Sequence, residues 1–189
     1  DSYQNAIKLN PDYQNAHNNL GTALQKNGDL NSAIQCFQKA LQMNPDFAQA
    51  HNNLGTALQE NGDLNSAIDS FQNAIKIQPD YQDAHNNLGN ILKEQGDLNS
   101  AILSFQKALK IKPNFEKAHN NLGNALQENG DLNSAILSFQ KALQIKPDYQ
   151  DAHNNLGNAL QEKGDLNSAI LSFQKALQIK PDFAQAHYN

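Results

Sequence analysis

Apolar residues recur along the chain with the spacing of α-helices. In residues 14–27, Ala16, Leu20, Ala23 and Leu24 share one arc when successive residues are placed about 100° apart around a helix. The pattern therefore predicts an amphipathic helix, and a second one follows it directly. The opposite arc of the first segment is polar, with Asn15, Asn18, Asn19, Thr22, Gln25 and Lys26. In residues 29–44 the apolar stripe consists of Leu30, Ala33, Ile34, Phe37, Ala40 and Leu41.

Short signals mark where these two helices end. Gly28 stands where a residue just past a helix C-terminus is expected, and Asp29 is a candidate N-cap for the second helix. Pro45 cannot continue a helix and restricts the residue before it. The two helices are therefore predicted to form a hairpin.

The hairpin pattern returns every 34 residues, and the sequence AHNNLG recurs unchanged in each first helix. One hairpin cannot bury both of its apolar stripes, so neighbouring hairpins must stack and share a core. Residues 1–11 resemble residues 69–79, the second half of a unit, and we expect the sequence to be a fragment of a longer array. The predicted full units are 14–47, 48–81, 82–115, 116–149 and 150–183, with the second-helix half of a truncated unit at 1–13 and the start of another at 184–189.

Eight positions of the unit carry a family resemblance. In the first unit they are His17, Leu20, Gly21, Leu24, Ala33, Phe37, Ala40 and Pro45. This pattern resembles the tetratricopeptide repeat (TPR), with His and Leu where that repeat usually has Trp and Tyr, and the resemblance covers the whole chain. It implies an all-α, right-handed superhelical solenoid of helix-turn-helix hairpins. In such a solenoid the first helices line a concave groove and the second helices form the outer face.

Two adjacent asparagines, Asn18 and Asn19, return in every unit near the centre of the polar arc. Asparagine is a middling-to-poor helix former, and two of them cost on the order of 1 kcal/mol relative to alanine. Duplication alone would repeat them, but the nearby position of Asn15 has drifted between units, which favours a function for the pair. The predicted groove residues, including a third asparagine in the last three units, are Asn18, Asn19, Asn52, Asn53, Asn86, Asn87, Asn120, Asn121, Asn154, Asn155, Asn90, Asn124 and Asn158.

A side-chain amide has the donors and acceptors of a peptide bond, so it can pair with a guest backbone whatever the guest's side chains are. Helices packed ~8–10 Å apart would present one amide for about every third residue of an extended segment. The row of Asn19, Asn53, Asn87, Asn121 and Asn155 is similar to the asparagine ladder of O-GlcNAc-transferase-like proteins. We therefore predict a non-enzymatic protein-interaction scaffold for extended peptides. The alternatives are the substrate-recognition arm of a larger O-GlcNAc-transferase-like glycosyltransferase and a self-assembling structural array.

The carboxylate clamp used by chaperone-binding members of this family is not expected here. Asn87 and Lys117 fit it, but Asn52, Thr56 and Asn121 stand where its other Lys, Asn and Arg would be. The uniformity of the units also suits a designed scaffold, although the drift noted above is typical of a natural array.

Composition limits the partners. The net charge is −5 and the 14 basic residues are scattered lysines, so no concentrated basic face for nucleic acid is expected. Apolar runs are far shorter than the ~20 residues needed to cross a bilayer, and no membrane partner is predicted. Cys36 stands alone where equivalent positions carry serine, which favours a reducing, cytoplasmic compartment.

Each unit has one histidine, such as His17, at the edge of the apolar arc, and we interpret it as a packing residue. Rings on helices ~8–10 Å apart cannot share one zinc ion, so we predict no metal, no other cofactor and no catalytic residue. Leu103, Leu137 and Leu171 fall opposite the apolar stripe of their helices and are candidates for self-association or for a partner patch. The uncapped ends of the array also predict head-to-tail self-association.

Overall fold

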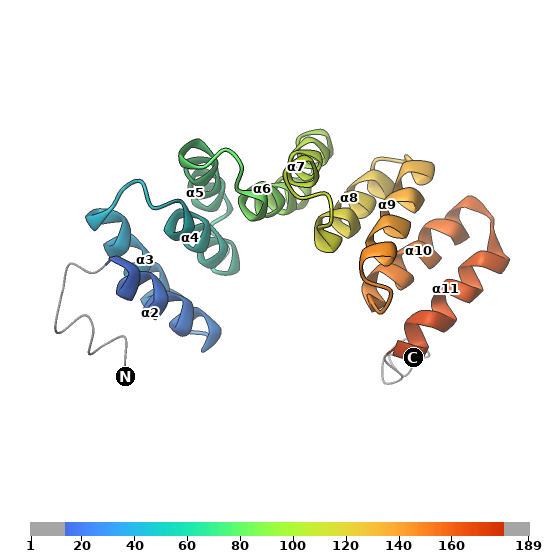
Figure 1. Cartoon of the computed structure of the whole chain (residues 1–189), viewed down its shortest axis with the longest axis horizontal. Helices are drawn as coiled ribbons and strands as arrows, with labels where there is room; N and C mark the ends of the chain where they lie inside the picture. Colours follow the sequence, from blue (N-terminus) through green and yellow to red (C-terminus); the bar gives the residue numbers. More distant parts are fainter. Residues whose placement is uncertain (1–13, 180–189) are drawn as a thin grey trace. The chain divides into compact units, whose positions relative to one another are not determined.

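The computed structural model describes residues 14–179, and this part of the chain is all helical, with no strand (Figure 1). It divides between Ile91 and Leu92 into two compact parts. From here on, unit 1 and unit 2 denote these two parts, and the 34-residue units of the sequence are called repeats or hairpins. The predicted partial repeats at 1–13 and 184–189, and residues 180–183, lie outside the described residues. Unit 1 contains α2 (Gln14–Lys26), α3 (Leu30–Met43), α4 (Ala48–Glu60), α5 (Leu64–Ile77) and most of α6 (Gln82–Glu94). Unit 2 contains the end of α6 and then α7 (Leu98–Ile111), α8 (Glu116–Glu128), α9 (Leu132–Ile145), α10 (Gln150–Lys163) and α11 (Leu166–Ile179).

Local signals place the helix ends as the sequence predicts. Asp29 accepts a hydrogen bond at Oδ1 from the backbone N–H of Ser32 (3.2 Å) and caps α3, and the same bond begins each later second helix. Gly28, just past α2, has a φ of +84°, in the left-handed region that glycine adopts without a steric penalty. Aspartate caps and left-handed glycines therefore set the turn inside each hairpin.

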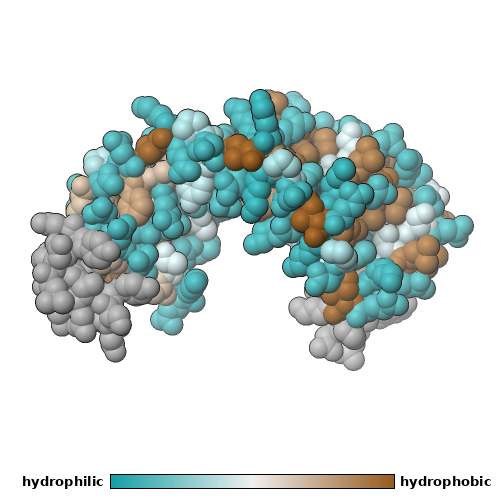
Figure 2. Space-filling model, in the orientation of Figure 1, coloured by the Kyte–Doolittle hydropathy of each residue, from teal (hydrophilic) through white to brown (hydrophobic). Residues whose placement is uncertain are grey.

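Hydrophobic surface is unevenly distributed over the described chain. Most of the face seen in Figure 2 is hydrophilic, and the hydrophobic residues appear there as separate patches. Of the large hydrophobic side chains that the structure shows exposed, all but Met43 lie in α7, α9 and α11. Within residues 14–179, no helix is both long and apolar enough to cross a membrane.

The phenylalanine of each second helix forms the centre of the core. In α3, α5, α7 and α9 this side chain is completely buried. Phe37 enters a notch at Gly21 of its own hairpin, where an added Cβ would lie only 2.7 Å from the ring Cε1. The absence of a side chain at Gly21 therefore allows the two helices of the hairpin to approach closely. Leu54 and Ala57 of the next hairpin belong to the same buried cluster, so each ring joins two hairpins.

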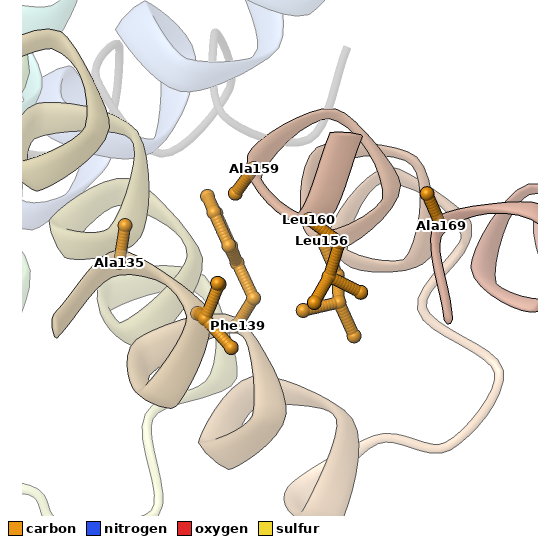
Figure 3. Close-up of a cluster of buried hydrophobic side chains, with 7 residues drawn as sticks. Ala135, Phe139, Leu156, Ala159, Leu160 and Ala169 are labelled. Atoms are coloured by element: carbon orange, nitrogen blue, oxygen red, sulfur yellow. The ribbon is translucent and has the colours of Figure 1, made fainter. Parts of the chain in front are cut away.

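Unit 2 repeats this arrangement. Phe139 of α9 lies in one buried cluster with Leu156, Ala159 and Leu160 of α10 (Figure 3). Phe173 of α11 also meets the notch of its hairpin, but it is only partly buried because no described helix follows α11. Within each unit, hairpin stacks on hairpin through a continuous core, and the fold is the predicted all-α solenoid of helix-turn-helix hairpins.

Histidines of the first helices form hydrogen bonds to the turns between hairpins. His51 donates a hydrogen bond from Nε2–H to the carbonyl oxygen of Pro45 at 2.9 Å, and His119 does the same to Pro113 at 2.9 Å. His85 and His153 make the equivalent bond. Because a carbonyl can only accept, this bond fixes the Nε2–H tautomer of the neutral ring. The structure therefore supports the interpretation of these rings as packing residues.

Candidate functional site

The two asparagines of each pair lie in different environments. The first one is buried in four hairpins: Asn18, Asn52, Asn86 and Asn120 expose between 2% and 7% of their surface. The helical projection placed these side chains in the open polar arc, and for this position it is wrong, because stacking covers part of that arc. Asn154 is half-buried, since no described hairpin stacks beyond α11.

Each of three buried asparagines accepts a hydrogen bond from the second asparagine of the next hairpin. Asn53 donates from Nδ2 to Oδ1 of Asn18 at 3.0 Å, and Asn87 donates likewise to Asn52 at 3.1 Å. In unit 2, Asn155 donates to Asn120 at 3.1 Å. A buried amide oxygen without a partner would cost about 1–3 kcal/mol, so this bond gives the pair a structural role. In these three cases a hydrogen bond between asparagines therefore links successive first helices.

The second asparagine of each pair is more accessible. Asn19 is exposed, and Asn53, Asn87, Asn121 and Asn155 are half-buried. A side-chain amide has two N–H donors and an oxygen that accepts two bonds. The bond to the preceding hairpin engages one donor, so most of the hydrogen-bonding capacity of Asn53 and Asn155 is left for water or a ligand.

The third asparagine lies one turn further along the same helix face. Asn90 and Asn124 are half-buried and Asn158 is exposed. In the two earlier hairpins threonine holds this position, and Thr22 and Thr56 donate their hydroxyls to the carbonyl oxygens of their own helices, four residues earlier. The late hairpins therefore carry an additional amide where the early ones carry a self-bonded hydroxyl.

Unit 2 has a recess on this face that the sequence analysis missed. It measures about 270 Å³ and is lined by Asn124, Gln127 and Glu128 of α8 and by Glu162 of α10. Gln127 donates to Oε1 of Glu162 at 2.6 Å, and Lys93 is ion-paired with Glu128 at 2.9 Å. The available signal was the glutamate that recurs near the end of four first helices, at residues 60, 94, 128 and 162.

The three predicted outer leucines are exposed. Leu103, Leu137 and Leu171 expose 58%, 62% and 63% of their surface on α7, α9 and α11. Equivalent positions in unit 1 carry Gln35 and Asp69, which are also exposed. The leucines lie on second helices, so they belong to a different surface from the asparagines.

The pKa shifts considered next belong to helix caps and to partly buried packing groups. The hydroxyl and then the backbone N–H of Ser66 lower the pKa of Asp63, and the caps of α7, α9 and α11 are shifted in the same way. Burial lowers the pKa of His119; the hydrogen bond to Pro113 opposes this effect and Lys141 adds to it. Burial raises the pKa of the Cys36 thiol, so this group is a poor nucleophile at neutral pH. Among the described residues, no three His, Cys, Asp or Glu side chains gather as metal ligands.

Family models match most of the chain. Models described as TPR repeat match residues 1–28, 57–96, 89–130 and 128–164. Models described as Tetratricopeptide repeat match residues 15–47, 36–69 and 151–183. A search of curated proteins finds no match.

Solved structures share the fold over nearly the whole described length. The crystal structure of MamA is 26% identical, with a TM-score of 0.77 over 87% of this chain and 96% of that chain. YrrB, described as a TPR protein with an unusual peptide-binding site, is 24% identical, with a TM-score of 0.74 over 96% and 94%. TTC0263, a thermophilic TPR protein in Thermus thermophilus, is 22% identical, with a TM-score of 0.73 over 89% and 92%. The last two likenesses concern the fold alone.

Proposed function

The chain belongs to the tetratricopeptide repeat family, and from that membership we propose that it is a protein-interaction scaffold whose first helices bind extended peptide segments. The proposed site is the asparagine face, defined as the second asparagine of each first helix with the asparagine three residues later where one is present. The scaffold is proposed to act by binding, without catalysis of its own. The face comprises Asn19, Asn53, Asn87 and Asn90 in unit 1, and Asn121, Asn124, Asn155 and Asn158 in unit 2.

One observation carries the proposal, namely the hydrogen bond between asparagines of successive first helices. It holds the amides of Asn53, Asn87 and Asn155 in one orientation before a ligand arrives. A group that is already ordered loses less conformational entropy on binding, and so its hydrogen bonds contribute more to affinity. The buried asparagine thus supports the accessible one, which explains why the two recur together.

The chemistry of the face suits a peptide backbone. After its bond to Asn18, the amide of Asn53 still offers an N–H and an oxygen, the groups that match the C=O and N–H of a guest peptide bond. Within unit 1 these amides recur once per hairpin, and a helix spacing of ~8–10 Å corresponds to about three residues of an extended chain. We therefore expect ligands of varied sequence that share an extended backbone.

The experiment is a selection from a display library of unstructured peptides, followed by titration of individual binders. The full chain is compared with a variant in which Asn53, Asn87 and Asn155 are replaced by alanine. Each lost hydrogen bond is worth about 0.5–1.5 kcal/mol, so the variant should bind at least about tenfold more weakly. Helicity by circular dichroism establishes that the variant is folded.

A matched control removes the same number of amides from the other side of the hairpins. Gln106, Gln140 and Gln174 are exposed on the second helices, and their replacement by alanine should leave binding unchanged. The proposal would be contradicted by peptides whose affinity is unchanged when the three asparagines are replaced, or whose affinity falls equally in the glutamine control.

A further inference from the structure

A second surface of unit 2 combines exposed leucines with lysines. Leu103, Leu137 and Leu171 are each followed four residues later by Lys107, Lys141 and Lys175. Residues four apart are neighbours on one side of a helix, and all six side chains are exposed. We call these six residues the leucine–lysine face. It does not overlap the asparagine face, so its function can be tested independently of the proposal above.

This face is free of acidic side chains in a chain that is acidic overall. No aspartate or glutamate lies within α7, α9 or α11, although the net charge of the chain is −5. In unit 1 the pattern is broken: α5 has Asp69 at the leucine position and Asn73 at the lysine position, and α3 has Gln35 at the leucine position. Among the described second helices, apolar and cationic side chains are thus combined at these positions only in unit 2.

The lysine of α9 also lines a recess. The recess measures about 550 Å³ and lies between α9 and the turn before α8, where Pro113, Asn114, His119, Lys141, Gln144 and Ile145 surround it. Its lining contains no carboxylate. A similar recess of about 590 Å³ in unit 1 is lined by the equivalent residues, but Asp46 replaces the asparagine, Asn73 replaces the lysine, and Lys76 replaces the glutamine. The unit 2 recess therefore combines one lysine with two side-chain amides and has no negative charge, which is an environment suited to a carboxylate.

We infer that the leucine–lysine face binds a segment of a partner protein in which leucine-like side chains alternate with carboxylates. The apolar side chain packs on Leu137, and the adjacent carboxylate enters the recess beside Lys141 and Asn114. A charge-assisted hydrogen bond to lysine is stronger than a neutral one and fixes the orientation of the segment. The partner is a peptide and not a lipid surface, because each exposed leucine has exposed polar neighbours about one helical turn further on, such as Gln140 and Lys141 beside Leu137.

The probe presents both groups of the proposed ligand, a leucine side chain and a neighbouring carboxylate, in every triplet of residues. The test therefore uses a labelled peptide of repeated Leu-Glu-Ser triplets, titrated into the full chain and followed by fluorescence anisotropy. Peptides of Leu-Lys-Ser and Ala-Glu-Ser triplets are the matched controls. We expect the first peptide to bind at least about tenfold more tightly than either control.

Two variants copy residues of unit 1, so both are compatible with the fold. One replaces Leu103, Leu137 and Leu171 by glutamine, as at Gln35, and the other replaces Lys107, Lys141 and Lys175 by asparagine, as at Asn73. Each should weaken binding of the Leu-Glu-Ser peptide by at least about tenfold, and the lysine variant should lose most of its salt dependence. The triple asparagine variant of the first proposal should bind this peptide normally.

Three results would overturn the inference. The first is equal binding of the Leu-Glu-Ser and Leu-Lys-Ser peptides, or binding unaffected by both variants. The second is an absence of peptide binding together with self-association, seen in sedimentation as a mass that rises with concentration. If the leucine variant abolishes that rise, the occupant of the face is a second copy of this chain. The third is no peptide binding with leucine- and lysine-dependent binding to anionic phospholipid vesicles, which would identify a membrane surface.

Discussion

α5 of unit 1 and α9 of unit 2 have the same length and the same core residues but different outer faces. Phe71 and Phe139 are both completely buried, and the alanines that flank them are equally buried. The outward position carries Asp69 in α5 and Leu137 in α9. The inward positions are fixed by packing against two helices, whereas an outward position can change without affecting the fold. Function specific to one unit is therefore expected on outward positions.

The asparagine pair does not follow this simple division. It is polar, yet Asn52 in unit 1 and Asn120 in unit 2 are as inaccessible as core residues. Both accept a hydrogen bond within the stack, and the one from Asn87 to Asn52 has its counterpart from Asn155 to Asn120. The two units thus share an apolar contact and a polar one between successive hairpins.

The largest expected effect concerns the shared apolar contact. Phe71→Ala and Phe139→Ala should each destabilise the chain by about 3–5 kcal/mol, because each removes a completely buried ring. Phe173→Ala should cost clearly less, since that ring is only partly buried. Urea unfolding followed by circular dichroism measures all three. A much larger loss of stability for Phe71→Ala than for Phe139→Ala, or the reverse, would show that the cores of the two units are not equivalent.

The glycine notch should give the next largest effect. An added Cβ would lie 2.7 Å from the ring of Phe71 at Gly55 and 2.5 Å from the ring of Phe139 at Gly123. Gly55→Ala and Gly123→Ala should therefore each cost about 1–3 kcal/mol through overpacking. Combining Gly55→Ala with Phe71→Leu should cost less than the sum of the two single changes, because the smaller side chain relieves the clash. Strict additivity in that pair would contradict the close contact.

The polar contact should be worth less. Asn87→Ala and Asn155→Ala each leave a buried oxygen without its donor, and the expected cost is about 1 kcal/mol, the lower end of the ~1–3 kcal/mol for such an oxygen, because alanine is the better helix former. A double-mutant cycle with Asn52→Ala in unit 1 and with Asn120→Ala in unit 2 isolates the pair energy. A coupling energy of zero in both cycles would remove the structural role of the pair.

Acid should weaken unit 2 through His119. Burial keeps the pKa of this ring below its ordinary value near 6.5. As the pH falls, the unfolded chain therefore binds a proton at a higher pH than the folded chain does. Stability should therefore fall as the pH is lowered from about 7.5 to 5.5, and His119→Gln should reduce that fall. Thermal unfolding across this range is the measurement. A pH dependence that is identical in the variant would show that the ring does not contribute.

The smallest effect on stability is expected at the outward positions. Leu137→Gln should change the free energy of unfolding by no more than about 0.5 kcal/mol, because the side chain is 62% exposed. Asp69→Leu in unit 1 should be equally tolerated. A loss of more than about 1 kcal/mol in either variant, measured by urea unfolding, would show that the outward positions support the fold.

Much of the fold could be predicted from the sequence because its signals are local. Asp29 and Gly28 act within one turn of chain, so their places in the sequence predict the helix ends. The exposure of the outer leucines could also be predicted, since a helical projection is adequate for a surface that no other helix covers. The burial of Asn18 could not be predicted, because a helical projection considers one helix alone and does not include the hairpin that stacks on it.

The recess beside Asn124 was missed for a similar reason, since it forms only when α8 and α10 lie side by side. Other expectations stay predictions. These are the repeat boundaries, head-to-tail self-association, and the arrangement of the array as an arm of an O-GlcNAc-transferase-like enzyme.

Photocross-linking tests the central claim, binding of extended peptides to the asparagine face, most directly. A peptide selected for binding to the full chain is given a photoreactive residue near its middle, and the linked sites are identified by mass spectrometry. We predict cross-links to the first helices, α4 and α6 or α8 and α10. Cross-links confined to the second helices or to the turns would contradict the claim.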